Sequence, residues 1–113
     1  MERSIFEPAN VFRFPQSVEY STEGVVSKRV IDNPAGSVTL FAFDKGQRLS
    51  THSAPYDALV QVVEGGAEIT INDVPHHLVA GECIIMPAQV PHAVNAVSQF
   101  KMILTMIKGS RQD

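Results

Sequence analysis

Hydrophobic and polar residues alternate along most of the chain, in short runs that are separated by turn residues. In the run 100–107, Phe100, Met102, Leu104 and Met106 share one face of an extended chain, and the intervening positions form the other. Clusters of Gly, Asp, Asn and Pro recur about every 8–12 residues, the spacing of turns between short strands. We find no convincing amphipathic helix. The pattern therefore predicts an all-β protein, either a sandwich or a barrel.

A single domain, residues 1–113, is expected because a chain of 113 residues supports one hydrophobic core but not two. Phe12 and Phe14 alternate with Arg13 before Pro15, which indicates a short edge strand. The predicted divisions are an N-terminal arm with this edge strand in 1–24, the barrel core in 37–107 and a frayed tail in 109–113.

A hairpin is predicted in the middle of the chain, with its turn at Asn72-Asp73. The return strand, 74–79, carries Pro75, which cannot donate a hydrogen bond to a neighbouring strand. We therefore expect an edge strand or a bend there. Cys83 lies in an apolar run and is expected to be buried as a small hydrophobe.

Composition excludes several classes of function. The net charge of −3 is scattered and there is no basic run, so no nucleic-acid partner is expected. No stretch approaches the ~20 apolar residues of a membrane span, and no signal peptide is recognised, so a cytoplasmic protein without a membrane partner is expected. A lone cysteine excludes an internal disulfide. The glycines match neither nucleotide-binding signature, and no nucleotide is expected.

Six residues in the middle of the chain carry a family resemblance. They are Gly46, His52 and Gly65 in a first segment and Gly81, Pro87 and His92 in a second. Their spacing resembles the two-motif signature of the cupins, and in particular of small single-domain cupins of the type-2 conserved-barrel kind. The resemblance implies an all-β fold, the cupin double-stranded β-helix or jelly-roll barrel. It also implies a homodimer, because cupins commonly pair through sheets and N-terminal arms.

The resemblance further implies that His52 and His92 face one lumen and bind a metal. Imidazole nitrogen suits divalent transition metals such as Zn, Fe, Mn, Ni or Cu. Two other ligand positions of the family are occupied by Ala54 and Ala58, which carry no donor atom. Asp57 would supply the missing carboxylate only if the strand register slipped by one residue. Without a metal, the two histidines are a hydrogen-bonded pair inside the barrel, one of which can act as a general acid or base.

Small and flexible side chains are expected to line the lumen around these histidines. The predicted lining residues are Ser50, Ala54, Ala58, Met86, Met102 and Met106. For the methionines, plain core packing is an equal alternative, because Met fills irregular apolar space.

Two functions follow, and the sequence assigns neither a catalytic residue nor an organic cofactor. The first is a metal-dependent cupin enzyme, such as an isomerase or a dioxygenase, that acts on a small molecule through a site around His52 and His92. The second is a non-catalytic cupin that binds or senses a small-molecule ligand without a metal.

Overall fold

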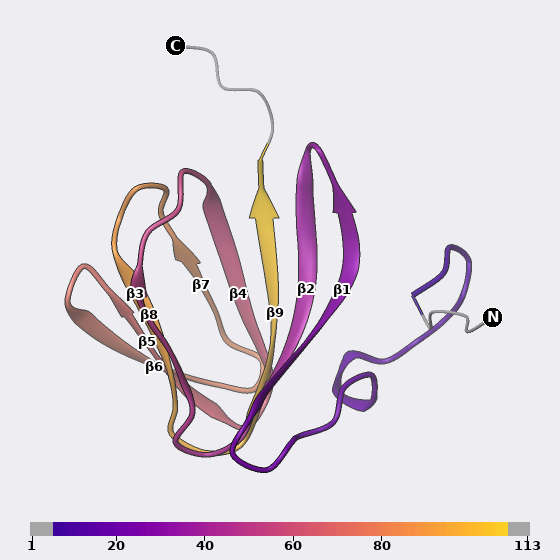
Figure 1. Ribbon diagram of the computed structural model, residues 1–113, viewed down its shortest axis with the longest axis horizontal. Coiled ribbons are helices and arrows are strands. Elements are labelled where there is room, and N and C mark those ends of the chain that lie inside the picture. Colours follow the sequence, from indigo (N-terminus) through magenta and orange to yellow (C-terminus); the bar gives the residue numbers. More distant parts are fainter. Residues whose placement is uncertain (1–5, 109–113) are drawn as a thin grey trace.

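The computed structural model describes residues 6–108 and consists of two antiparallel sheets that face each other (Figure 1). The five-stranded sheet has the order β1 (Val25–Asn33), β2 (Gly36–Phe43), β9 (Phe100–Ile107), β4 (Asp57–Glu64) and β7 (Cys83–Met86). The four-stranded sheet has the order β3 (Arg48–His52), β8 (His92–Ala96), β5 (Gly66–Ile71) and β6 (Val74–Val79).

Strand pairing joins segments that are far apart in the sequence. Strand β9 lies between β2 and β4, and β8 lies between β3 and β5. This crossing-over between two sheets is the topology of a jelly roll. The predicted all-β jelly-roll barrel is therefore confirmed. Within residues 6–108, no helix has the length and apolar character needed to cross a membrane.

The hydrophobic core fills the space between the two sheets. Side chains at alternate positions of β4, β5 and β8 are buried there, together with Phe100 and Met102 of β9. Phe43 and Phe100 stack in this core with ring centroids 4.6 Å apart, and neither ring is exposed to solvent. Each such buried large side chain stabilises the fold by roughly 1.5–3 kcal/mol. The two sheets converge in the lower part of the barrel in Figure 1.

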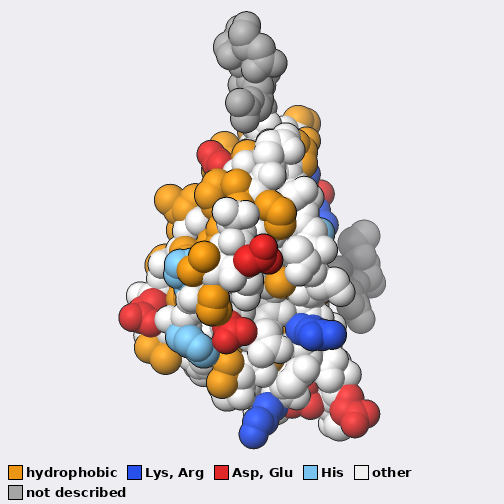
Figure 2. Space-filling model, turned by 90° about the vertical axis from the view of Figure 1, so that its left-hand side faces the viewer, with side chains coloured by type: hydrophobic (Ala, Val, Ile, Leu, Met, Phe, Trp, Pro, Cys, Tyr) orange, Lys and Arg blue, Asp and Glu red, His pale blue; other side chains and the backbone are white. Residues whose placement is uncertain are grey.

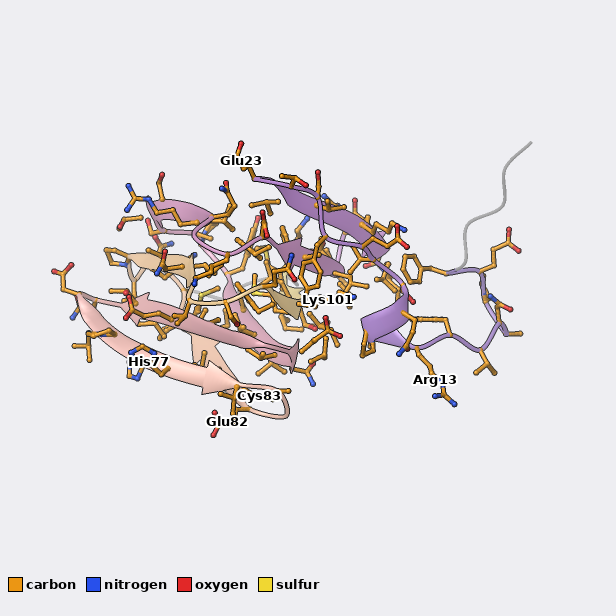
Figure 3. The ribbon with its side chains drawn as sticks, turned by 90° about the horizontal axis from the view of Figure 1, so that it is seen from below. Arg13, Glu23, His77, Glu82, Cys83 and Lys101 are labelled. Carbon is orange, nitrogen blue, oxygen red and sulfur yellow. The ribbon has the colours of Figure 1, made fainter. Side chains whose placement is uncertain are left out.

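A second cluster covers the outer face of the five-stranded sheet. The N-terminal segment lies across this face, and Val18, 1% exposed, packs with Leu40, Ala42 and Ile103. Lys101, which is buried, donates a hydrogen bond to the Pro15 carbonyl. Figure 3 shows Lys101 between the barrel and this segment.

Tyr20 and Glu64 extend this attachment. The Tyr20 hydroxyl donates to Glu64 Oε2 at 2.5 Å, and the Lys101 Nζ lies 3.6 Å from the same oxygen. Burial, together with this hydrogen bond, raises the pKa of Tyr20. The segment therefore packs against the barrel through both apolar and polar contacts.

Two expectations about individual elements were wrong. The edge strand expected around Phe12 and Phe14 is absent, because residues Phe14–Gln16 form a 3-10 turn (η1) that Pro15 favours at its start. Cys83 is exposed, because β7 is an edge strand and Cys83 lies on its outer face, opposite Gln61 of β4. Figure 3 shows it at the periphery of the molecule.

The hairpin expectation was correct. Strand β6 is an edge of the four-stranded sheet, as Pro75 indicated. Asn72 and Asp73 both have positive φ, 50° and 68°, which is the geometry of a type I′ turn. Figure 2 shows the side of the molecule where β5 and β6 lie, with hydrophobic, acidic and histidine side chains interspersed. The predicted frayed tail, 109–113, lies outside the described residues.

Candidate functional site

His52 and His92 contact each other at the open end of the barrel. His52 ends β3 and His92 begins β8, and their Cα atoms are partners in the antiparallel register. Their ring centroids are 4.4 Å apart, with the planes at 68°. His92 shares the inward face of β8 with Val94 and Ala96 and is 6% exposed, whereas His52 is exposed. The pair thus extends from solvent to the barrel interior.

Backbone carbonyls orient both rings. His52 Nδ1 lies 2.8 Å from the Ser50 carbonyl, and His92 Nδ1 lies 3.3 Å from the Val90 carbonyl. A carbonyl oxygen only accepts, so each Nδ1 is the donor. In the neutral rings, the lone pair is then on Nε2, which is free to accept a hydrogen bond or to coordinate an ion.

The buried ring is biased toward its neutral form. Burial lowers the pKa of His92 below its usual value of 6.5, and the neighbouring His52 lowers it further. The hydrogen bond to the Val90 carbonyl acts in the opposite direction and is the weaker cause. At neutral pH, His92 is therefore an uncharged imidazole.

A β-bulge in β3 turns His52 toward His92. Leu49 pairs with Val94 and His52 pairs with His92, so three residue steps on β3 oppose two on β8. Such an extra residue re-aims the side chains that follow it. Counting by twos placed Ser50 on the same face as His52. The structure instead leaves Ser50 exposed, in a shallow groove of about 450 Å³ on the outside of the four-stranded sheet.

The two alanine positions have different surroundings. Ala58 is 4% exposed, faces the core, and is paired with Met86 of the neighbouring strand β7. Asp57 does not slip into its place, because its Oδ1 accepts a hydrogen bond from the Ala88 amide at 2.8 Å. Ala54 is half-buried in the loop before β4, and its carbonyl accepts from Gln89.

The donor set does not fit a resident catalytic metal. Between residues 6 and 108, no three His, Cys, Asp or Glu side chains converge on one point that could hold an ion. Catalytic metal sites normally have three protein ligands, and structural sites four. His52 and His92 offer two imidazole nitrogens with properly oriented rings, and the remaining positions are apolar.

The three methionines predicted to line the lumen have different surroundings. Met86 and Met102 are 3% and 1% exposed and lie in the core. Met106 is half-buried and lines a cavity of about 510 Å³. The other residues that line this cavity are Ser27, Arg29, Ser37, Thr39, Phe41, Leu104 and Lys108.

This cavity lies on the inner face of β1, β2 and β9. Phe41 and Thr39 alternate with Leu40 and Ala42, which face outward under the N-terminal segment. Arg29 is the register partner of Thr39 and therefore shares its inner face. The upper ends of β2 and β9 lie at the same end of the barrel as the β3–β4 and β7–β8 connections that flank the histidines (Figure 1).

Two cationic residues at this cavity, Arg29 and Lys108, are not indicated by the sequence motifs. Arg29 Nη1 lies 2.6 Å from Asp32 Oδ2, and Lys108 Nζ lies 3.8 Å from Asp32 Oδ1. Two cations thus share one carboxylate. The period of two in 25–29 was a usable signal, but only the pairing of β1 with β2 shows which face is inner.

Comparison with known proteins agrees with this architecture. Residues 39–108, well over half of the chain, match the cupin domain family. The chain is a cupin. Over 48 residues it is 40% identical to Protein SchB of Streptomyces halstedii, a match that covers 42% of this cupin and 35% of that protein. The chain thus matches only about a third of the length of that relative.

Two solved structures resemble this cupin over most of its length. A conserved protein of unknown function from Streptococcus pyogenes is 36% identical, with a TM-score of 0.87, and the match covers 93% of this chain and 92% of that one. A cupin 2 conserved barrel domain protein from Leptotrichia buccalis is 37% identical, with a TM-score of 0.83 over 86% of this cupin and 47% of that chain. These likenesses establish the family and the fold.

The backbone explains why the cupin motifs require glycine. Gly46, Gly65 and Gly81 have φ angles of +85°, +75° and +96°, where residues with a Cβ are strained. Gln89 occupies the position of the inner glycine of the second motif and has the same type of backbone, with φ 69°. The chain therefore keeps the turn geometry of the family at a position where it has lost the glycine.

Proposed function

We propose that this cupin binds a small organic molecule in the mouth of its barrel, with the His52–His92 pair as the polar contact and without a resident metal. The observation that carries this proposal is a pair of imidazoles in contact, oriented by backbone carbonyls, with no third side-chain ligand within residues 6–108. An open cavity of about 510 Å³ on the inner face of the opposite sheet supports it, because small-molecule sites have volumes of roughly 300–1,000 Å³.

The imidazole pair suits direct contact with a ligand. His92 is neutral at neutral pH, so its Nε2 accepts a hydrogen bond from a ligand hydroxyl or amide. His52 is exposed and is therefore reached from solvent. The methyl side chains of Ala54 and Ala58 carry no donor atom that could help to coordinate a metal ion. A role in binding or sensing therefore has more support than a metal-dependent reaction.

A metal-dependent enzyme is the second candidate, because cupins often bind metals. The specific observation in its favour is that both Nε2 atoms are free while both Nδ1 atoms are held. An ion held by two imidazoles would require donors from the substrate or from water to complete its coordination. Isomerase or dioxygenase chemistry would then depend on a Zn, Fe, Mn, Ni or Cu ion.

Imidazole NMR signals test the binding proposal. A fragment set that contains acids, amides and polyols is added to protein labelled at histidine. We expect some fragments to shift the Cε1–H signals of His52 and His92 and to leave His77 unchanged, because His77 is exposed on β6. If no fragment shifts the paired signals at millimolar concentration, the proposal is wrong.

Elemental analysis separates the two candidates. Protein purified without added metal should contain far less than one transition-metal ion per chain, and chelator treatment should leave fragment binding intact. A stoichiometric first-row metal whose removal abolishes binding would instead favour the enzyme.

We also propose a homodimer, supported by apolar exposure in the N-terminal segment, where Val11 is 95% exposed.

A further inference from the structure

The cavity opposite the histidine pair combines positive charge with an apolar wall. We infer that the ligand of this cupin is a small carboxylic acid with an apolar body, whose carboxylate binds Arg29 and Lys108. This inference rests on the proposed function, since it assumes that the barrel mouth binds a small molecule. It adds the chemical class of that molecule.

Positively charged side chains outnumber negatively charged ones at this cavity. Arg29 and Lys108 both line the cavity, and among residues 6–108 Asp32 is the one carboxylate with which they form ion pairs. Asp32 contacts Arg29 closely, at 2.6 Å, but lies 3.8 Å from Lys108. A guanidinium has five N–H donors, and the ion pair to Asp32 uses Nη1. Donors therefore remain on Arg29 for a second carboxylate.

The position of Asp32 shows that a carboxylate fits between the two cations. Its two oxygens are each directed at a different cation, Oδ2 at Arg29 and Oδ1 at Lys108. The Arg29 side chain is 56% exposed, so it is accessible to a ligand that enters from solvent. Planar, bidentate recognition of a carboxylate is the interaction that arginine provides best.

The apolar wall lies beside these charges. Phe41, Leu104 and Met106 line the cavity and are only half-buried, so part of each side chain is open to a ligand. An aromatic ring and a flexible thioether together accommodate an aryl or alkyl body. Hydroxyls of Ser27, Ser37 and Thr39 on the same wall would hydrogen-bond polar substituents. A ligand held there lies on the inner face of the five-stranded sheet, and His92 is on the inward face of the other sheet, although neither histidine lines the cavity itself.

A phosphate ligand is less well matched than a carboxylate. Phosphate sites typically use a helix N-terminus or a glycine-rich loop whose amides converge. In residues 6–108 the only helix is the three-residue η1, which lies on the outer face of the barrel. The cavity offers two cationic side chains and hydroxyls, which suit a singly charged acid.

Isothermal titration with a matched pair of probes tests the inference. The probes are 3-phenylpropanoate and 3-phenylpropanamide, which differ only in the charged group. We expect the acid to bind at least about tenfold more tightly than the amide, because hydrogen bonds to charged groups contribute more than neutral ones. Arg29→Gln should weaken binding of the acid by about tenfold or more and leave the amide unchanged. Arg48→Gln, at an exposed arginine on the outside of β3, is the matched control and should change neither.

Each outcome decides the inference. Equal binding of acid and amide, or an unchanged affinity in Arg29→Gln, overturns the carboxylate assignment. Tighter binding of inorganic phosphate than of the acid, measured by competition, also overturns it. The proposed function survives those results if neutral fragments still shift the His52 and His92 signals. If neither acids nor neutral fragments shift them, both proposals are wrong.

Discussion

Two imidazoles of identical chemistry have different environments in this site. His92 is buried among inward-facing side chains, while His52 is exposed, although the two rings are in contact. Placing two positive charges at this distance is unfavourable, and burial makes a charge on His92 more costly still. These two effects lower the pKa of His92, so its ring stays neutral and remains a hydrogen-bond acceptor.

His52→Gln should raise the pKa of His92. Burial, the larger cause of the shift, remains in this variant, but the charge of His52 is removed. The pKa of His92 should therefore move toward 6.5 without reaching it. A pH titration of the His92 Cε1–H signal measures the change. An unchanged pKa would show that the two rings do not interact electrostatically.

Folding stability should fall as the pH is lowered through the range where unfolded histidine titrates. The pKa of His92 is lower in the folded protein than the usual 6.5, so the unfolded state binds more protons between these two values. The free energy of unfolding therefore decreases as the pH falls below about 6.5, and this loss ends below the folded pKa. His92→Gln should flatten this part of a urea-denaturation profile, whereas His77→Gln should not.

Restoring the two missing donors should create a metal site. In Ala54→His with Ala58→Glu, the new imidazole and carboxylate join the existing pair, which gives four potential ligands. The metal-free variant should be destabilised, because Ala58 is 4% exposed and a buried carboxylate without a partner is costly. Ni²⁺ or Zn²⁺ should restore the melting temperature and bind at least about tenfold more tightly than to the parent protein.

The same double substitution in a His92→Gln background is the control. It retains the new carboxylate and the new imidazole but lacks one of the original nitrogens, so the gain in metal affinity should largely disappear. Calorimetric titration compares the three proteins. If the double variant binds these ions no better than the parent, positions 54 and 58 do not face the histidine pair.

Two turns between strands require glycine for different reasons, one for its left-handed backbone alone and the other also for its lack of a side chain. Gly65 and Gly46 both have positive φ, but only Gly65 is closely approached by other atoms. A Cβ on Gly65 would lie 2.0 Å from the Gln99 carbonyl oxygen, while a Cβ on Gly46 would meet nothing within 4 Å. Gly46→Ala should therefore cost about 1–2 kcal/mol, the strain of a left-handed backbone alone. Gly65→Ala should cost roughly 3 kcal/mol or more, because backbone must also move.

Urea denaturation of the two variants checks this difference. Because both substitutions add the same methyl group to a left-handed glycine, their difference isolates the close approach of β9 to the β4–β5 turn. Equal losses of stability in the two variants would contradict the packing of this turn against Gln99 and Phe100.

Much of the barrel could be predicted because short-range patterns determine it. Strands were recognised from alternation, the β5–β6 hairpin from Asn72-Asp73, and the edge position of β6 from Pro75. The motif spacing was sufficient to single out His52 and His92, which the structure brings into contact. These features need only local chemistry or a fixed distance along the chain.

Features that depend on long-range register could not be predicted. The bulge between Leu49 and His52 exists only relative to β8, so counting by twos put Ser50 on the wrong side of the sheet. Likewise, Arg29 faces the cavity because β1 pairs with β2 and β2 pairs with β9, whose partner residues lie 57 to 71 positions later in the chain. A single sequence gives the alternation but not which face is covered.

At the scale of the whole molecule, the N-terminal segment completes the packing of the five-stranded sheet. Val18→Asp should detach it, because a carboxylate cannot remain among Leu40, Ala42 and Ile103 without a partner. Trypsin should then cleave after Arg13 much faster, and the melting temperature should fall. Val79→Asp, at an exposed valine of β6, is the control and should change neither. Unaltered cleavage in Val18→Asp would mean that the segment does not depend on this contact.

Contact between subunits is a separate question from packing within one subunit. Val11 belongs to the same segment but is 95% exposed, so it contributes little to the fold of its own chain. If this segment joins two copies, burial of Val11 from each subunit stabilises the dimer. Val11→Asp should therefore favour the monomer without lowering the melting temperature of that monomer. Light scattering at micromolar concentration should give a dimer mass for the parent and a monomer mass for the variant. A parent protein that is already monomeric there would refute the homodimer, while the barrel and its histidine pair would be unaffected.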